Sequence, residues 1–262
     1  MPSSAPAQSV RSADGARIAF DQQGDGAPLI LVEPALHYRD FSSFSGLAPA
    51  LSSEFTVYTY DRRGRGESTD ATPFAPDREV EDLEALIAEA GGSAHVYGYS
   101  SGALLALRGA AHGLAIGRLA ALEPPLQEDG AERPDPLTAE LAELLAVGRT
   151  GEAVEHFHRN IGVPAEFVGG MRSTPEWAKM ESVAHTLVYD CTISDTTTSE
   201  MLGSVDVPTL VLDSEGSTDN LTGWAATVAQ RLPQSTHRSL AGEWHTVPDE
   251  VLAPVLIEFF RR

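Results

Sequence analysis

Residues 94–110 read AHVYGYSSGALLALRGA, and this stretch decides the fold. Its beginning, AHVYGY, has the apolar and aromatic side chains that are typical of a buried strand. The small and apolar residues at its end are typical of a packed helix. Between the two, residues 98–102 read GYSSG and match the pattern G-x-S-x-G. The stretch therefore predicts a strand, a sharp turn and a helix in immediate succession.

Ser100, at the centre of this pattern, is a candidate nucleophile. Flanking glycines let neighbouring backbone approach a sharp turn closely, which side chains would prevent. An ordinary Gly/Ser loop also matches so short a pattern, so the prediction depends on the strand before it and the helix after it. A serine hydroxyl is a weak nucleophile at neutral pH and requires a base within hydrogen-bond reach.

The chain has eight histidines that could supply this base. His245 follows the last predicted strand and precedes the last predicted helix, so we expect its loop at the same sheet edge as Ser100. His185 is a candidate substrate contact. His156 and His158 stand two residues apart on a predicted helix and point in different directions, which counts against a metal site.

Strands and helices alternate along most of the chain. This order predicts an α/β fold with a mostly parallel central sheet and helices on both faces. The predicted strands at 16–22 and 29–32 are separated by Gly-Asp-Gly at 24–26, a turn pattern that predicts a hairpin between them. Residues 1–9 are rich in Ser, Ala and Pro and are expected to form a tail. We predict strands at 16–22, 29–32, 55–61, 94–99, 118–124, 205–213 and 235–242, and helices at 77–90, 102–113 and 251–260.

Residues 126–203 interrupt this alternation. Their pattern is mostly helical, with prolines between the helical stretches and without strong strand patterns. We interpret the segment as a helical insertion that forms a lid over the site. The core would then consist of residues 10–125 and 204–262. A chain of 262 residues has the length of one α/β domain with such an insertion.

Composition excludes several classes of protein. With 38 acidic and 18 basic residues the net charge is −20, which repels phosphate backbones and argues against a nucleic-acid partner. No segment approaches the ~18 consecutive apolar residues of a membrane span, and residues 1–15 lack the apolar region of a secretory signal. Cys191 is the only cysteine, so neither an internal disulfide nor a cysteine metal framework is expected. We therefore expect a soluble, cytoplasmic protein.

Together these motifs resemble the α/β-hydrolase superfamily, in particular its small single-domain serine hydrolases with a helical cap. The resemblance implies that Ser100 attacks an acyl carbonyl, that His245 transfers the proton and that an acid orients the imidazole. It does not identify a substrate, because this fold hosts many reactions. It spans residues 16–260 and rests on LILVEP (29–34), YDRRGRGES (60–68), GYSSG (98–102), LEPP (122–125), VPTLVLD (207–213) and GEWHTV (242–247).

The acid departs from the commonest pattern of the family. Relatives usually carry it after the strand that corresponds to 207–213, where this chain has Ser217, and Asp219 comes two residues later. In some relatives the acid instead ends the strand that follows the nucleophile's helix, and Glu123 holds that position. We favour Glu123, with Asp219 as the alternative acid and Asp213 as a third candidate.

The resemblance also implies an oxyanion hole made of two backbone N–H groups. Ser101 would supply one of them. The other would come from the loop after the strand LILV, where relatives typically have His-Gly and this chain has Glu33-Pro34. Because proline has no N–H, we expect Ala35 to be the second donor, with Leu36 as the alternative.

These residues indicate a cofactor-independent serine hydrolase that cleaves an ester, lactone or thioester of a small, largely apolar molecule. A serine nucleophile argues against epoxide hydrolase and dehalogenase chemistry, both of which use a carboxylate. Alternatives are a C–C bond hydrolase, a cyclase or an acyl transferase with the same triad, or a non-catalytic ligand-binding protein on this scaffold. The expected partner is a small-molecule substrate, no metal is expected, and the oligomeric state is open. Candidate substrate-binding residues are Leu36, Tyr99, Trp177, His185 and Trp244.

Overall fold

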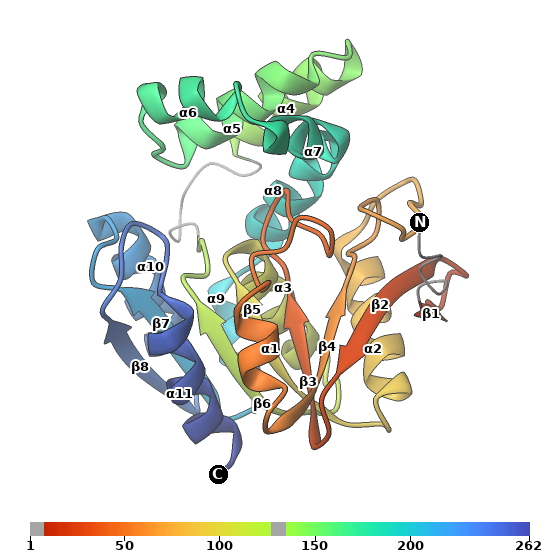
Figure 1. Ribbon diagram of the computed structural model, residues 1–262, viewed down its shortest axis with the longest axis vertical. Helices are drawn as coiled ribbons and strands as arrows, with labels where there is room; N and C mark the ends of the chain where they lie inside the picture. The colour runs from red at the N-terminus through yellow and green to blue at the C-terminus, as the bar shows by residue number, and fades with distance from the viewer. Residues whose placement is uncertain (1–7, 127–134) are drawn as a thin grey trace.

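The computed structural model describes residues 8–126 and 135–262. Within these ranges the strands form one eight-stranded sheet in the order β1-β2-β4-β3-β5-β6-β7-β8 (Figure 1). The first two strands run antiparallel to their neighbours, and all pairs from β4 to β8 are parallel. The mostly parallel sheet is therefore confirmed. The strands are β1 (Gln8–Arg11), β2 (Arg17–Gln23), β3 (Ala27–Val32), β4 (Phe55–Tyr60), β5 (Ala94–Tyr99), β6 (Ile116–Leu122), β7 (Thr209–Ser214) and β8 (Ser235–Leu240).

Helices cover both faces of the sheet, as expected. On one face α1 and α11 pack together over apolar side chains of β3, β4, β6 and β7. On the other face α2, α3 and α10 enclose a second apolar cluster, in which most of α3 is buried. The helices of these two layers are α1 (Leu47–Leu51), α2 (Pro76–Glu89), α3 (Ser101–Ala111), α10 (Asp219–Arg231) and α11 (Asp249–Phe260).

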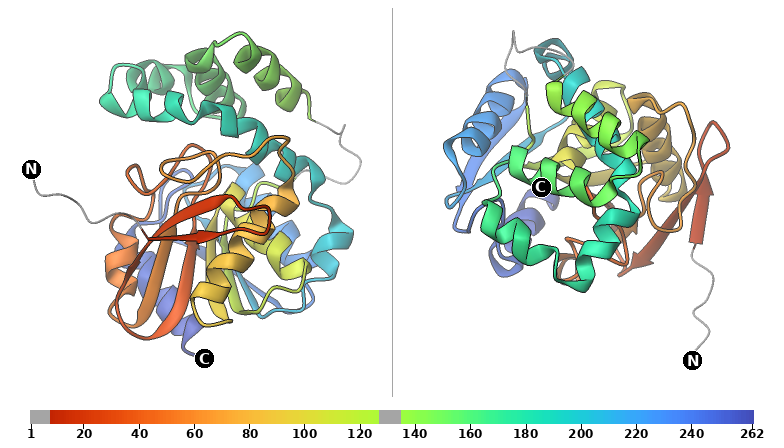
Figure 2. Two further views of the ribbon diagram at one scale, coloured as in Figure 1. Left: turned by 90° about the vertical axis from the view of Figure 1, so that its right-hand side faces the viewer. Right: turned by 90° about the horizontal axis from the view of Figure 1, so that it is seen from above.

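A further group of helices lies above the carboxyl ends of the parallel strands (Figures 1 and 2). We call α4 to α7 the helical layer. It has its own apolar core, which also includes Leu36 from the loop after β3. The chain then returns through η1 and α8 along α3. These elements are α4 (Pro136–Ala146), α5 (Thr150–Asn160), α6 (Ala165–Met171), α7 (Pro175–Ser182), the 3-10 turn η1 (Ala184–Thr186) and α8 (Leu187–Thr196).

Apart from Leu126, the described part of the predicted insertion consists of residues 135–203, whose regular structure is helical throughout. Its last helix, α9 (Ser199–Gly203), contacts α3 and α10 and so packs on the core. The first part of the predicted insertion, 127–134, lies outside the described residues. The action of the segment as a lid stays a prediction.

The predicted hairpin between β2 and β3 is wrong, because β4 lies between them and pairs with both. The connection is a tight turn that crosses the start of β4. A Cβ on Gly24 would lie 2.3 Å from the carbonyl oxygen of Phe55, and a Cβ on Gly26 would lie 2.3 Å from that of Glu54. The glycines therefore mark a close backbone crossing, which has the same sequence pattern as a hairpin turn.

The predicted tail is also wrong at its end. Gln8 and Ser9 belong to β1, which pairs antiparallel with β2 at the edge of the sheet. A strand of four mostly exposed residues has no apolar alternation to reveal it. The remainder of that prediction, residues 1–7, lies outside the described residues.

Candidate active site

Ser100 lies at the sharp bend between β5 and α3. Its φ and ψ of 53° and −122° are unusual for a residue with a side chain. Its backbone N–H donates to the carbonyl of Leu122 on β6 at 2.8 Å. A Cβ on Gly98 would lie 2.5 Å from the carbonyl oxygen of Gly102, and a Cβ on Gly102 would lie 2.3 Å from that of Val32. The bend therefore requires glycine on both sides of Ser100.

Glu123 and His245 are in direct contact at the carboxyl edge of the sheet. Glu123 follows β6 directly and is fully buried. One of its oxygens, Oε2, is hydrogen-bonded to Nδ1 of His245, and Oε1 accepts the backbone N–H of Ser214 at 2.8 Å. Because Nδ1 is engaged, Nε2 is the ring nitrogen of His245 that is left for a reacting group.

The surroundings of Glu123 favour its ionised form. Burial opposes the charge, but hydrogen bonds from His245, from the backbone of Ser214 and from the hydroxyl of Ser217 outweigh it and hold the pKa below its ordinary value. A carboxylate at Nδ1 fixes the tautomer of the imidazole and stabilises a positive charge on it.

Neither of the other candidate acids, both in the described ranges, is bonded to the ring of His245. Asp219 is exposed in the first turn of α10. Asp213 is buried and contacts Nε2 of His237 on the neighbouring strand. Ser217, which stands where relatives carry the acid, accepts the backbone N–H of His245 at 2.9 Å. Of the carboxylates in the described ranges, Glu123 is the one bonded to this ring.

A cavity of about 740 Å³ lies between the edge of the sheet and the helical layer, and both Ser100 and His245 line it. Across residues 8–126 and 135–262, no hydrogen bond joins the hydroxyl of Ser100 to the ring of His245. Such contacts are often long before substrate binds and tighten in the complex. The structure thus brings the hydroxyl and the imidazole to one cavity.

Three of the predicted substrate-binding residues line the same cavity: Leu36, Tyr99 and Trp244. The ring of Tyr99 lies 5.0 Å from that of His245, and its hydroxyl donates to the carbonyl of His245. The ring of Trp244 lies 5.4 Å from the same imidazole. The hydroxyl of Tyr99 therefore ties the loop of His245 to the end of β5.

Trp177 and His185, the other two predicted substrate-binding residues, do not line this cavity. Trp177 is buried in the core of the helical layer, and its indole N–H donates to Glu181 at 2.9 Å. His185 lies over the loop after β4, with Nε2 3.5 Å from a carboxylate oxygen of Asp70. Helical periodicity placed both residues on helical segments, but it does not reveal which face turns toward the sheet.

Several lining residues were missed for the same reason. The helical layer contributes Phe157, His158 and Met171, and α10 contributes Trp224. Burial lowers the pKa of His158 and lowers the pKa of His37, another lining residue, to about 4. Both rings are therefore uncharged at neutral pH.

The predicted oxyanion donors also border the cavity. Ser101 is the first residue of α3, and Ala35 lies in the loop after β3. In the part of the chain that the structure describes, neither backbone N–H has an acceptor. Leu36 has a φ of 64°, and its side chain is buried in the core of the helical layer. The loop is thus anchored from above by an apolar contact.

Glu33 is a buried carboxyl beside this loop. It contacts the hydroxyl of Ser42 and accepts the backbone N–H of Ser43 at 3.2 Å. Burial raises the pKa of Glu33 to about 7 despite these hydrogen bonds. The residue that replaces the usual family sequence is therefore a structural link between two loops at the cavity.

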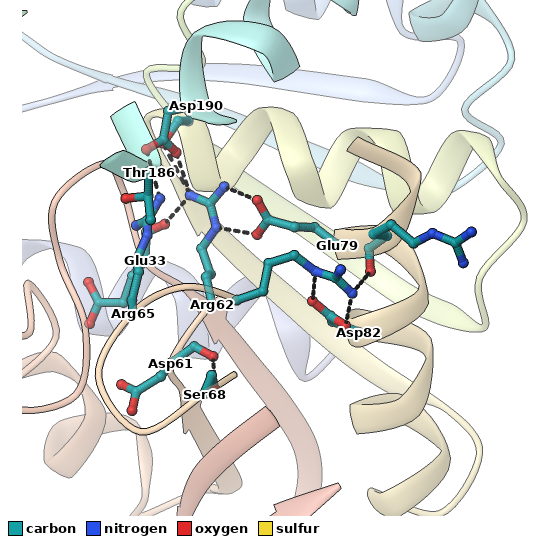
Figure 3. Close-up of polar contacts among 12 residues, drawn as sticks. Glu33, Asp61, Arg62, Arg65, Ser68, Glu79, Asp82, Thr186 and Asp190 are labelled. Atoms are coloured by element: carbon teal, nitrogen blue, oxygen red, sulfur yellow. Dashed lines mark hydrogen bonds and ion pairs between the residues drawn. The ribbon is translucent and has the colours of Figure 1, made fainter. Parts of the chain in front are cut away.

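The arginines of the segment YDRRGRGES belong to a buried ionic network (Figure 3). Arg62 donates to both oxygens of Glu79, at 2.7 and 2.9 Å, and to Asp190 of α8 at 2.7 Å. Arg65 donates to the other oxygen of Asp190, also at 2.7 Å. The sequence motif alone does not reveal that Asp190 of α8 is the partner of both arginines.

Residues 8–126 and 135–262 contain no group of three or more His, Cys, Asp or Glu side chains that could hold a metal ion. In the same ranges, no helix has the length and apolar character needed to cross a membrane.

The chain is similar to known proteins along nearly its whole length. The sequence model of the alpha/beta hydrolase family matches residues 18–253. An alpha/beta hydrolase from Sphaerobacter thermophilus DSM 20745 is 44% identical, with a TM-score of 0.89 over 97% of this chain and 100% of that one. No curated protein matches the chain.

Two more distant structures share the fold. The enol-lactonase from Burkholderia xenovorans LB400 is 18% identical, with a TM-score of 0.71 over 97% of this chain and 100% of that one. The meta-cleavage product hydrolase from Pseudomonas fluorescens IP01 is 15% identical, with a TM-score of 0.65 over 97% of both chains. From the match over residues 18–253 and the 44% identical relative, this chain belongs to the alpha/beta hydrolase family.

Proposed function

We propose that this hydrolase is a serine hydrolase that cleaves an ester, lactone or thioester through an acyl-enzyme. The observation that supports this most is the contact between Glu123 and Nδ1 of His245 at the cavity that Ser100 lines. In this proposal Ser100 is the nucleophile, His245 the base and Glu123 the acid.

The reaction would run in two halves. As Oγ of Ser100 bonds to the acyl carbon, its proton moves to Nε2 of His245 and the carbonyl electron pair moves to oxygen. The N–H groups of Ser101 and Ala35 would stabilise that oxyanion. When it collapses, the bond to the leaving group breaks and the leaving group takes the proton from His245. In the second half, water attacks the acyl carbon and gives a proton to His245. The bond to Oγ then breaks, Oγ takes that proton back, and the carboxylic acid product leaves.

The cavity favours small, uncharged and largely apolar substrates. Most of its lining is aliphatic or aromatic. The lining residues that the structure describes include Asp135, Asp190, Asp195 and Asp249, of which Asp190 is paired with Arg62 and Arg65 behind the wall. No lysine or arginine is among these lining residues. His37 and His158 add no positive charge, because burial lowers the pKa of each. A substrate carboxylate would therefore meet no cation in the described wall.

Turnover of a matched panel tests the proposal: an aryl ester, a lactone, a thioester and a vinylogous 1,5-diketone of similar size. We expect hydrolysis of one or more of the first three, and its loss in Ser100→Ala and in His245→Ala. Product from the diketone alone would instead identify a C–C bond hydrolase. A ligand that binds without any turnover, or unimpaired turnover in either variant, would contradict the proposal.

A further inference from the structure

Asp190 joins α8 to the loop that follows β4. It is buried, and its two oxygens accept hydrogen bonds from Arg62 and Arg65, each at 2.7 Å. Figure 3 shows the guanidinium of Arg62 between Asp190, on the α8 side, and Glu79. Glu79 balances the second positive charge through its two bonds to Arg62. The four side chains form a buried, charge-balanced cluster.

Arg65 connects this cluster to the loop after β3, which carries the predicted oxyanion donor Ala35. Its Nη1 donates to the carbonyl of Pro34 at 2.6 Å and to that of His37 at 3.2 Å. In a trans peptide the C=O and the following N–H point in opposite directions. The bond to Pro34 therefore fixes the direction of the N–H of Ala35, which is the predicted oxyanion donor.

Arg62 reaches the other side of the same site. Its Nη1 donates to the carbonyl of Glu33 at 3.2 Å and to the hydroxyl of Ser101 at 3.4 Å. The backbone N–H of Ser101 is the other predicted oxyanion donor. Both arginines that bind Asp190 thus also bind one of the two segments that carry these donors.

We propose that Asp190 is a positioning residue that orients the oxyanion donors through Arg65 and Arg62; the proposal rests on the serine-hydrolase function above. Without its carboxylate, two buried guanidinium groups would face each other with one counter-ion. Burial and the charge of Arg62 already lower the pKa of Arg65. Arg65 would then turn away, and the peptide between Pro34 and Ala35 would lose the bond that holds its plane.

A pair of inhibitors separates this role from simple binding. An alkyl trifluoromethyl ketone forms a hemiketal: Oγ of Ser100 bonds to the carbonyl carbon, the electron pair moves to oxygen and the proton moves to His245. Its methyl ketone analogue binds the cavity without that oxyanion. The inhibition constant of the methyl ketone divided by that of the trifluoromethyl ketone therefore measures how well the oxyanion hole stabilises the charge. A direct contact of Asp190 with the part that the two ligands share changes both constants alike and cancels in this ratio. Wild-type preference for the trifluoromethyl ketone tests the proposed function separately.

We expect Asp190→Asn to reduce this ratio at least tenfold. Asp82→Asn is the matched control, because Asp82 holds Arg63 in an equally buried bidentate pair, at 2.8 and 2.7 Å, that touches neither donor segment. This variant should keep the wild-type ratio. Arg65→Lys retains the charge, but one ammonium cannot reproduce the forked contact with Asp190 and Pro34, so it should lower the ratio as well.

If Asp190→Asn does not fold, the ratio in Arg65→Lys decides. An unchanged ratio in a folded Asp190→Asn or Arg65→Lys protein would overturn the proposal. An equal loss in Asp82→Asn would also overturn it, because the effect would then follow from any broken ion pair.

Discussion

At the scale of single residues, backbone strain is concentrated at the site. Among the described residues, the non-glycine positions with positive φ are Leu36, Ser100, Glu123 and His245. Each lines the cavity or contacts a residue that does. Conformations of this kind cost roughly 1–3 kcal/mol each and persist where the surrounding structure holds them. This distribution is what a preorganised catalytic site requires.

Glu33 gives the stability of the protein a specific pH dependence. Its carboxyl has an ordinary pKa of 4.5 and a folded pKa of about 7, so the folded state binds the proton more tightly. This contribution is fully present below pH 4.5 and is lost as the pH rises to about 7. From these two values, the loss is about 3 kcal/mol.

Urea denaturation of wild type and Glu33→Gln, at pH 5 and at pH 8, measures this effect. The glutamine has nearly the same size and cannot ionise. We expect the free energy of unfolding of wild type to fall relative to that of the variant by about 2–3 kcal/mol between these pH values. A difference that stays constant with pH would show that Glu33 ionises normally in the folded protein.

At the scale of elements, the sequence predicted where strands and helices lie along the chain better than it predicted which of them pair or pack together. The strand, bend and helix around Ser100, and the placement of Glu123 after β6, follow from local patterns and the order of elements. The pairing of β2 with β4 does not, because it depends on where the crossover through α1 returns. The short helix α1 and the helix α10 were not predicted.

Side-chain direction was the second limit. In α10 the apolar residues Leu221, Ala225 and Val228 have helical spacing and are buried, while Asp219 in its first turn faces solvent. Recognising this helix would have weakened Asp219 as a candidate acid. For Trp177, helical spacing does not tell the core of the helical layer from the wall of the cavity.

The helical layer should set which substrates fit. Phe157 of α5 lines the cavity, so Phe157→Ala should improve kcat/KM for bulkier acyl groups relative to small ones, because it enlarges the cavity on that side. The control is Phe167→Ala in α6, since Phe167 is 65% exposed. Kinetics with esters of increasing acyl length measure the preference. The same preference profile in Phe157→Ala and wild type would contradict a role of this layer in specificity.

At the scale of the whole molecule, charge should select against anionic substrates. The net charge is −20, and the described cavity wall has aspartates without lysine or arginine. We expect 4-nitrophenyl butyrate to exceed the 4-nitrophenyl monoester of succinate in kcat/KM by at least tenfold. Raising the ionic strength should reduce this difference in kcat/KM, because salt screens the long-range repulsion between the protein and the anionic ester. Equal kcat/KM values at low salt would contradict this reading of the wall.

The central claim is that Glu123 activates Ser100 through His245. The most direct measurement is the rate at which a fluorophosphonate modifies the protein, followed by peptide mapping of the adduct, in wild type, Glu123→Gln and Asp219→Asn. We predict an adduct on Ser100, a rate about 10²- to 10⁴-fold lower in Glu123→Gln, and the wild-type rate in Asp219→Asn. An adduct on another residue, or a wild-type rate in Glu123→Gln, would contradict the account.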